Sequence, residues 1–414
     1  RRVLYLKLEE YISSHKNTDQ IFAVVFMDIN NFKMINDSLG HQAGNELLKI
    51  FANRLKNSIG PQDFVGRIGG DEFIIIFPNL TYKSDVEPII KKIVDILQEK
   101  IQINDRAFIL KSSIGVSFFP CDSEKTDKLI AFADMAMYKA KEKKGTVLYQ
   151  SYFPKFSIEL ANKHHMGQNL KSAIINNAFY LVFQPIYSIV DKDWVKVEVL
   201  LRWRDHVGPE VFIPLASEIG LMPEIGLWVL EQACKVRLEL AKISNKPIKF
   251  SINISAEQIQ SSDDINLLID AIKKYKCPPE WLEFELTESL LFDMAKADNF
   301  IKKIRSLGIS VAIDDFGTGY SSFSYLKNLH FDTIKIDKQF VNSIFSNSRE
   351  MSLVLSIIEI SHSLNAQITV EGVETKEHFD FCVQQGCHYV QGYYIAKPCD
   401  LSSLIDKLST LPQT

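Results

Sequence analysis

The sequence predicts an α/β protein in two parts, a palm-like α+β domain over residues 1–150 and a TIM-type (β/α)8 barrel over residues 151–414. Three observations support this prediction. The chain of 414 residues is long enough for one domain of about 150 residues and a barrel of about 250. The first third contains a strand and a Gly-Gly hairpin signal, whereas apolar runs after Tyr180 alternate with helix-like segments.

The first third places two aspartates at neighbouring ends of predicted strands. IFAVVFMDINNF is typical of a buried strand that ends near Asp28, and FVGRIGGDEFIIIF of two strands joined by a turn at Gly69 and Gly70. Asp71 follows that turn directly. Palm-type nucleotidyl transferases hold paired metal ions with carboxylates placed in this way, and two metal ions can clamp a reacting phosphate.

In the rest of the chain, seven apolar runs end in polar residues, and helix-like segments follow. The carboxyl ends of barrel strands converge on one face, where polar residues are typical of catalytic sites. The runs are VKVEVLLRW, KFSINIS, WLEFELTE, VAIDDFG, TIKID, ITVEGVE and YVQGYY, and their polar residues are Glu198, Asn253, Glu285, Glu288, Asp314, Asp315, Lys335, Asp337, Glu371, Glu374 and Gln391.

The most informative run is SVAIDDFGTGYSS, in which Asp314 and Asp315 are adjacent at a strand end. Side chains alternate along a strand, but this rule relaxes at the last residues, so both carboxylates can face one pocket. Two such charges at close range repel unless a cation lies between them. The alternative is that the pair caps the next helix. Carboxylate and amide oxygens favour Mg²⁺ or Mn²⁺, and the sequence has no Cys/His cluster with zinc spacing.

The second part of the chain resembles the EAL-domain family of cyclic di-GMP phosphodiesterases from about Phe183 to Pro398. The motifs that carry the resemblance are QPI, EVLLRW, FIPLA, NIS, ELTES, DDFGTGYSS, KIDKQFV, EGVET and QGYYIAKP. The resemblance implies hydrolysis of cyclic di-GMP to linear pGpG at a two-metal site. The metal ligands it implies are Glu198, Asn253, Glu285, Asp314 and Asp315.

Other roles follow from the same resemblance. Lys335 and Glu371 would position and deprotonate the attacking water, and Glu288 would hold the DDFGTG loop. The residues implied for substrate binding are Gln184, Arg202 and Gln391. Three departures from the family pattern are Val199 within the signature, Ser217 in place of the usual Glu, and a shorter loop after Trp203. None removes a ligand, although a receptor that binds the dinucleotide without cutting it stays an alternative.

The first part resembles the diguanylate cyclase family from the first Arg to about Lys144, through FKMINDSLGH, the intact GGDEF of Gly69–Phe73 and ADMAMYKAK. This adds a cyclase-type identity to the palm-like domain and implies GTP as a ligand. Asp28 and Asp71 would bind metal, and Glu72 lies within the signature. The further residues implied for GTP are Lys33 and Lys141 at the triphosphate and Asn36 and Asn45 at guanine.

Several departures weaken cyclase activity. Asn45 replaces the family's guanine-reading Asp, and an amide offers one acceptor where a carboxylate accepts from both guanine N–H groups. The usual Gly-Arg-Asn is absent, unless Lys143 or Lys144 substitutes for its Arg. Gly60 replaces the Arg of the product-feedback motif. We therefore expect a GTP-binding regulator or a weak cyclase, and a bifunctional cyclase/phosphodiesterase stays an alternative.

Composition limits the remaining classes. A formal net charge of −4 argues against a general DNA or RNA binder, and six scattered Cys indicate reduced thiols in a cytoplasm.

Residues from about Gln150 to Ala178 have helical spacing, which predicts either a junction that carries a signal or the barrel's first packing helix. We also expect a homodimer, because cyclisation joins two GTP molecules, and an upstream sensory or membrane-anchoring region, because the chain opens on RRVLYLKLEE.

Overall fold

The computed structural model describes residues 2–16, 18, 20–103, 106–142, 149–205, 207–244, 246–317 and 329–410. The chain divides into two compact units, Arg1–His164 and His165–Thr414. This division lies inside helix α6 (Pro154–Ala173), whereas the sequence placed the boundary just ahead of that helix, after residue 150. The helix expected between Gln150 and Ala178 is confirmed.

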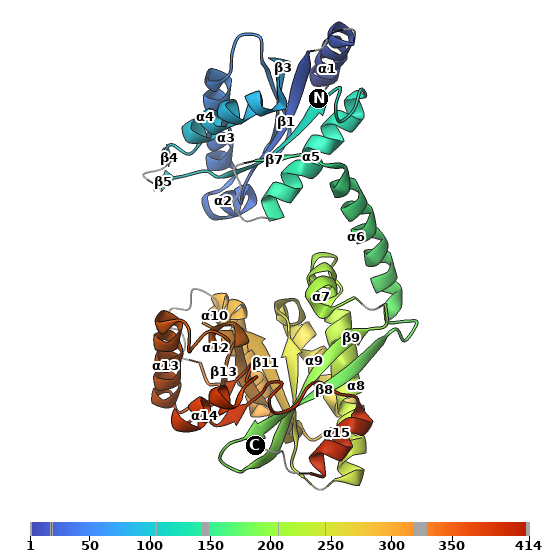
Figure 1. Ribbon diagram of the computed structural model, residues 1–414, viewed down its shortest axis with the longest axis vertical. Coiled ribbons are helices and arrows are strands. Elements are labelled where there is room, and N and C mark those ends of the chain that lie inside the picture. The colour runs from blue at the N-terminus through green and yellow to red at the C-terminus, as the bar shows by residue number, and fades with distance from the viewer. Residues whose placement is uncertain are drawn as a thin grey trace. The chain divides into compact units, whose positions relative to one another are not determined.

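Unit 1 is built on a sheet of order β2-β3-β1-β6-β7 (Figure 1). Its central strand β1 pairs antiparallel with both β3 and β6. The predicted hairpin is confirmed, since β2 and β3 are antiparallel and Gly70 has a φ of 51° in the turn. The strands are β1 (Ile21–Ile29), β2 (Phe64–Gly69), β3 (Glu72–Leu80), β4 (Ile101–Ile103), β5 (Arg106–Phe108), β6 (Ser112–Phe119) and β7 (Gln150–Ser151), and the helices α1 (Arg2–His15), α2 (Phe32–Leu39), α3 (His41–Ser58), α4 (Val86–Leu97) and α5 (Thr126–Glu142).

Strand β1 is apolar along most of its length because both faces of the sheet are covered. Ala23, Val25 and Met27 pack in one core with residues of α3 and α4. Phe22 and Val24, which alternate with them, pack in a second core with residues of α1 and α5. The buried strand thus delivers Asp28 to the end of the sheet, where it pairs in register with Glu72 of β3.

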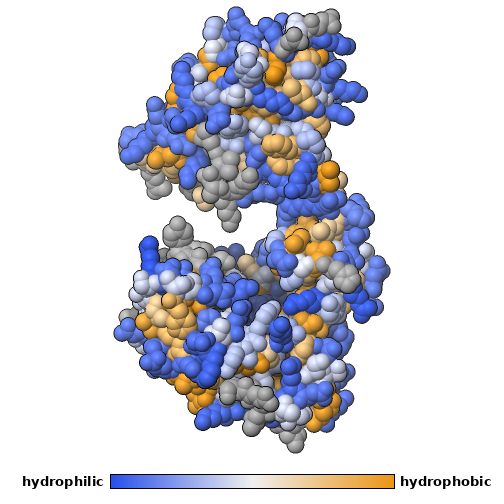
Figure 2. Space-filling model, in the orientation of Figure 1, coloured by the Kyte–Doolittle hydropathy of each residue, from blue (hydrophilic) through white to orange (hydrophobic). Residues whose placement is uncertain are grey.

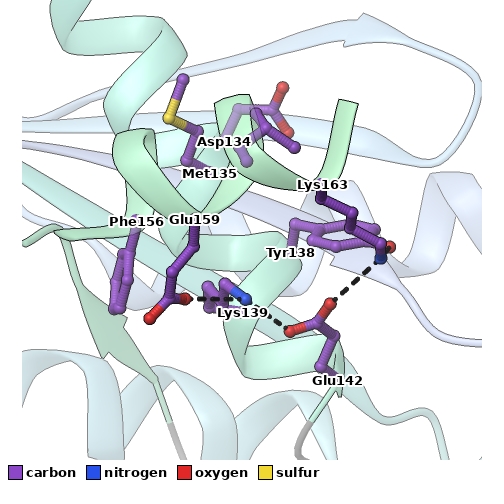
Figure 3. Close-up of a pocket in the computed structure, with 9 residues that line it drawn as sticks. Asp134, Met135, Tyr138, Lys139, Glu142, Phe156, Glu159 and Lys163 are labelled. Carbon is purple, nitrogen blue, oxygen red and sulfur yellow. Dashed lines mark hydrogen bonds and ion pairs between the residues drawn. The ribbon is translucent and has the colours of Figure 1, made fainter. Parts of the chain in front are cut away.

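Helix α5 also packs against the first part of α6 (Figure 3). Between them lies a cavity of about 200 Å³ whose apolar lining includes Met135, Tyr138 and Phe156. Ion pairs join the two helices at its edge, Lys139 to Glu159 at 3.1 Å and Lys163 to Glu142 at 3.6 Å. Such partly exposed pairs contribute at most about 1 kcal/mol each, so the apolar contacts hold most of this packing.

Unit 2 is a closed barrel of order β10-β11-β12-β13-β14-β15-β8-β9, with helices outside the strands (Figure 1). This confirms the predicted barrel. The strands are β8 (Phe179–Ser188), β9 (Asp193–Trp203), β10 (Lys249–Ile254), β11 (Leu282–Thr287), β12 (Ser310–Phe316), β13 (Thr333–Ile336), β14 (Gln367–Val370) and β15 (Tyr389–Val390). The helices are α7 (Pro209–Glu218), α8 (Met222–Ile243), α9 (Ser262–Tyr275), α10 (Met294–Ser306), α12 (Lys338–Val341), α13 (Ser348–Ser363), α14 (Lys376–Gln384) and α15 (Leu401–Leu408).

The barrel departs from an all-parallel TIM-type barrel at β8. This strand is antiparallel to both β9 and β15. The reason is its short connection to β9, since a few residues can join antiparallel strands but a parallel pair needs a crossover of a dozen residues or more. The barrel therefore closes between β8, the first strand of unit 2, and β15, the last.

Helix ends in unit 2 follow from local sequence. Ser261 and Asp264 form a capping box at α9, and Asp293 accepts from Lys296 N at the start of α10. Pro209 and Pro223 lie in the first turns of α7 and α8, where the missing N–H removes no helical bond.

In the face shown in Figure 2, hydrophobic residues lie in patches among hydrophilic ones. Among the described residues, none of the helices has both the length and the apolar character that crossing a membrane requires.

Candidate active site

The barrel strands place charged side chains inside the barrel at two levels. On β9, β11 and β13, residues two apart share a face, so each strand contributes one inward residue to each level. Neighbouring strands are aligned so that Asn253 of β10 pairs with Glu285 of β11. The level nearer the strands' carboxyl ends contains Glu198, Glu285 and Lys335, and the level below it contains Lys196, Glu283 and Thr333.

Lys335 is the centre of the upper level. Its side chain is 2% exposed, and its Nζ lies within ion-pair distance of four carboxylates. The distances are 2.7 Å to Glu371 Oε1, 2.9 Å to Glu285 Oε2, 3.2 Å to Asp314 Oδ1 and 3.9 Å to Glu198 Oε1. One ammonium group therefore faces four acidic groups, and the cluster has an excess of negative charge.

The pKa values reflect that excess. Burial raises the pKa of Glu371 to about 8, with Lys335 opposing the shift and Asp314 and Glu198 adding to it. Burial likewise holds the pKa of Glu285 well above its usual value, against the pull of Lys335. Burial would lower the pKa of Lys335, yet the surrounding carboxylates keep it well above its usual value. Protonation of the acids is favoured because the cluster has too little positive charge.

Asp314 and Asp315 face the same cavity, as the sequence predicted. The β12–β13 register shifts between Ile313 and Phe316, and Asp315 has a φ of 52°, in the left-handed region. This local change of backbone direction interrupts the alternation of side chains, so adjacent residues can turn to one side. The Asp315 N–H donates to Asp314 Oδ1 at 2.9 Å. Burial, together with Asp314 and Asp337, raises the pKa of Asp315 to about 6.

A cavity of about 340 Å³ opens above this level. Its lining is mainly polar and acidic. The lining residues are Gln184, Glu198, Leu200, Asp314, Asp315, Asp337, Lys338, Glu371, Gly372, Glu374, Gln391, Gly392 and Tyr393. Sequence analysis assigned no role to Lys338 and Tyr393, although they lie within the motifs KIDKQFV and QGYYIAKP that it singled out.

An amide network orients Glu198 at the wall of this cavity. Gln391 Nε2 donates to both Glu198 Oε2 and Gln184 Oε1, and Gln184 Nε2 donates to Ala396 O at 3.1 Å. On the other side of Glu198, Asn253 Nδ2 donates to Oε1 at 3.1 Å. Gln184 and Gln391 are expected to bind the substrate. Their hydrogen bonds also help to fix the orientation of Glu198, which is a candidate metal ligand.

The donor set fits a divalent cation. Among the described residues, no three acidic, His or Cys side chains already converge on one metal position, because the carboxylates converge on Lys335. However, Glu285 Oε1 is buried and has no hydrogen-bond partner. A buried carboxylate oxygen without a partner costs free energy, and the cluster supplies hard oxygen donors with excess negative charge. The predicted ligands thus suit a divalent cation, which would compete with Lys335 for the same carboxylates.

Two other predicted residues are not among the described residues that line the cavity. Glu288 is buried at the start of a short 3₁₀ helix, and its Oε2 accepts from Gly317 N at 2.8 Å, which ties it to the strand end after Asp315. Arg202 is half-buried, and its guanidinium donates to Leu201 O at 2.8 Å. The remainder of the DDFGTGYSS motif, from Thr318, lies outside the described residues.

Unit 1 brings together its own acidic cluster at the end of β1. Asp28 is buried, and Lys141 Nζ lies 2.7 Å from its Oδ1. Burial and Asp28 raise the pKa of Asp71, and burial raises that of Glu72 with Asp28 and Asp71 contributing. The predicted metal-side residues and Lys141 thus lie close together.

Sequence analysis missed Asp134 in this cluster. Burial and the charge of Asp28 raise the pKa of Asp134, and Asp134 in turn adds to the rise that burial causes in the pKa of Glu72. A signal was present in the sequence, because Asp134 and Lys141 are seven residues apart on α5, and residues two helical turns apart share a face.

Of the residues predicted for guanine and triphosphate, Lys33 and Asn36 lie on α2, Asn45 on α3 and Lys141 on α5. Asn36 packs closely against Gly44, since a Cβ there would lie 1.8 Å from its Oδ1, so a larger residue at position 44 would require the Asn36 side chain to move. Asn45 and Lys33 are exposed. Asn45 lies at the edge of a hollow of about 420 Å³ that Lys49, Lys56 and Arg67 also line. Lys143 and Lys144 lie outside the described residues.

Two protein-family models match the chain. The EAL domain matches residues 167–398, more than half of the chain, and the diguanylate cyclase GGDEF domain matches residues 1–146. The chain belongs to the GGDEF–EAL family. The barrel is therefore the EAL domain, and the five-stranded unit is the GGDEF domain.

Curated bacterial proteins resemble the chain over nearly its whole length. Signaling protein YkoW of Bacillus subtilis is 36% identical over 396 residues, which is 93% of this chain and 48% of YkoW. The bifunctional diguanylate cyclase/cyclic di-GMP phosphodiesterase MucR of Pseudomonas aeruginosa is 32% identical over 98% of this chain and 60% of MucR. The chain thus spans about half the length of these curated relatives.

A solved structure supports the EAL assignment. The PaMucR phosphodiesterase in its c-di-GMP complex has a TM-score of 0.55 and 32% sequence identity, covering 58% of this chain and 99% of that one. Two departures from the EAL pattern have a structural account here. Val199 is buried in the barrel core, and the Ser217 hydroxyl donates to Glu257 Oε1. The serine therefore links α7 to Glu257, which follows β10.

Proposed function

We propose that the EAL domain hydrolyses cyclic di-GMP to linear pGpG with Mg²⁺ or Mn²⁺. The observation that carries this proposal is the cluster of four carboxylates around Lys335, with Glu285 Oε1 buried and without a partner. Such a cluster gains most from a divalent cation, and the adjoining cavity of about 340 Å³ gives the cluster access to a ligand.

In this proposal Glu198, Asn253, Glu285, Asp314 and Asp315 hold the metal ions. Divalent ions, when bound, lower the pKa of the attacking water and neutralise charge on the phosphate oxygens. Lys335 orients the water, and Glu371 Oε1, 2.7 Å from Lys335 Nζ, accepts its proton. The water oxygen forms a bond to phosphorus as the bond from phosphorus to the ribose oxygen breaks, and that oxygen takes up a proton.

The remaining residues position the substrate and the loop. We assign Arg202, Gln184 and Gln391 to the dinucleotide, and Glu288 to the loop after Gly317, whose N–H it accepts at 2.8 Å. The GGDEF domain acts in this proposal as a GTP-binding regulator or weak cyclase, and the protein as a homodimer. The name of MucR makes a bifunctional enzyme the second candidate. Asn45 favours the first, because its amide cannot match the acceptor pair of a carboxylate.

The test of the proposed function is hydrolysis by the purified protein. We expect chromatography to show linear pGpG after incubation of cyclic di-GMP with Mg²⁺ or Mn²⁺, and no product with excess EDTA. Uncut cyclic di-GMP under both metals, with binding detected by calorimetry, would establish a receptor instead. Strong synthesis of cyclic di-GMP from GTP would make the protein bifunctional.

Asn45→Asp tests the GGDEF domain. Restoring the second acceptor is expected to strengthen GTP binding by about 1–3 kcal/mol and to increase the preference for GTP over ATP. Calorimetric titration with each nucleotide measures both effects. Asn53→Asp is the matched control, since Asn53 lies on the same helix α3 and lines the same hollow. An equal gain in both variants would show that added negative charge, and not guanine recognition, is responsible.

A further inference from the structure

A second set of charged groups lies buried directly below the candidate active site. Lys196 Nζ lies 2.6 Å from Glu283 Oε2, and their side chains are 4% and 3% exposed. Two hydroxyl groups complete the set: Ser251 Oγ donates to Glu283 Oε1 at 2.8 Å, and Thr333 Oγ1 lies 3.3 Å from Glu283 Oε2. Lys196 Nζ also lies 4.4 Å from the centre of the Tyr389 ring.

The lower level differs from the upper one because its carboxylate oxygens all have hydrogen-bond or ion-pair partners. Both carboxylate oxygens of Glu283 have partners, and its charge is matched by one ammonium group. Glu285, two residues further along β11, has one oxygen bonded to Lys335 and the other without a partner. The lower level is therefore complete in itself, whereas the upper level is open to a further ligand.

The lower ion pair lies on the same two strands as two of the candidate metal ligands. Lys196 and Glu198 lie on β9, and Glu283 and Glu285 lie on β11. Strand β10 separates these two strands in the sheet and pairs with both. The Lys196–Glu283 bond therefore crosses β10 inside the barrel, and Ser251 of β10 binds the same carboxylate.

We propose that Lys196 and Glu283 are positioning residues for the metal site, because their ion pair fixes the separation of the strands that carry Glu198 and Glu285. This inference rests on the proposed function. The pair touches neither substrate nor metal, and it acts through the backbone of β9 and β11. Residues that orient ligands from behind commonly change metal affinity about 10–100-fold when they are replaced.

Stability and positioning can be separated by replacing both partners. Loss of one partner leaves a buried charge and destabilises by about 3–5 kcal/mol, whereas an apolar pair of similar volume is often neutral. The double variant Lys196→Met/Glu283→Leu is therefore expected to keep its melting temperature. If the ion pair positions the ligands, the variant loses metal affinity all the same.

The experiment is calorimetric titration of Mn²⁺ into the full chain, without substrate. All proteins carry Asp71→Asn, which disables the candidate metal site of the GGDEF domain. We expect the Mn²⁺ dissociation constant of the double variant to rise about 10–100-fold. In a separate assay of cyclic di-GMP hydrolysis, we expect kcat to fall by a larger factor than KM changes. Lys246→Met/Asp193→Leu is the matched control, because this 2.7 Å ion pair also involves β9 but is about one-third exposed. We expect wild-type Mn²⁺ affinity in the control.

The outcomes are distinct. Wild-type affinity in a folded double variant would overturn the positioning role and leave the proposed function intact. If that variant does not fold, Glu283→Asp replaces it, since it keeps both charges but shortens the side chain that meets Lys196 across β10; unchanged Mn²⁺ affinity there would equally overturn the proposal. Absence of Mn²⁺ binding in the parent protein would refute the metal assignment itself, and this inference with it.

Discussion

Lys335→Ala is expected to lower the free energy of unfolding of the metal-free protein by about 3–5 kcal/mol. Lys335 is the ion-pair partner of Glu198, Glu285, Asp314 and Glu371, so its loss leaves three buried acidic groups and the half-buried Glu371 facing one another. Mg²⁺ is expected to restore part of the loss by supplying positive charge. Urea unfolding with and without Mg²⁺ measures both effects, and hydrolysis is expected to stay impaired even when stability returns.

Lys249→Ala is a suitable comparison for that measurement. Lys249 also lies on a barrel strand, but its Nζ donates to Ser310 Oγ at 2.6 Å and contacts no group of the acidic cluster among the residues described. Its loss is expected to cost about 1 kcal/mol without dependence on Mg²⁺. An equally large, Mg²⁺-independent loss in both variants would show that Lys335 contributes packing and not charge compensation.

Asp314→Ala and Glu198→Ala are each expected to reduce kcat by roughly 100-fold or more, because each removes a charged oxygen donor from the proposed metal site. Their partners differ. Asp314 lies 3.2 Å from Lys335, and Glu198 accepts from Asn253 and Gln391. Initial rates over a range of Mg²⁺ concentrations would show whether high metal concentration recovers part of the activity.

Glu280→Ala provides the control for loss of one carboxylate from the EAL domain. Glu280 is exposed and lies in the 3₁₀ helix before β11, away from the strands' carboxyl ends. We expect unchanged kcat and KM. Full activity in either Asp314→Ala or Glu198→Ala would contradict the ligand assignments.

The sequence predicted the upper level of the site because each of its groups is visible within a single segment. Glu198, Glu285 and Asp314 lie on apolar runs that are typical of strands, and the convergence of barrel strands brings such residues to one face. Even the shared orientation of Asp314 and Asp315 could be expected, although the positive φ that produces it could not. That backbone conformation depends on the β12–β13 register shift, which no single segment specifies.

The lower level could not be predicted in this way. Alternation within WLEFELTE indicates that Glu283 and Glu285 share a face, but not that Lys196 meets Glu283 across β10. Such contacts depend on the relative register of three strands. The reversed direction of β8 was also missed, because its apolar run looks the same in either direction. Lys338 and Tyr393 reach the cavity from residues after strand ends, where side-chain direction follows no simple period.

The closure of the barrel between its first and last strands has a practical consequence for fragments of the chain. Gln391 donates to both Glu198 and Gln184 of β8, and backbone hydrogen bonds join Phe183 to Cys399 in both directions. The side chains that hold Glu198 in place, directly or through Gln391, therefore come from the opposite ends of the EAL sequence. Shortening the domain from either side would release Glu198 before it removed any ligand, so a fragment designed for study must extend from before Phe179 to beyond Cys399.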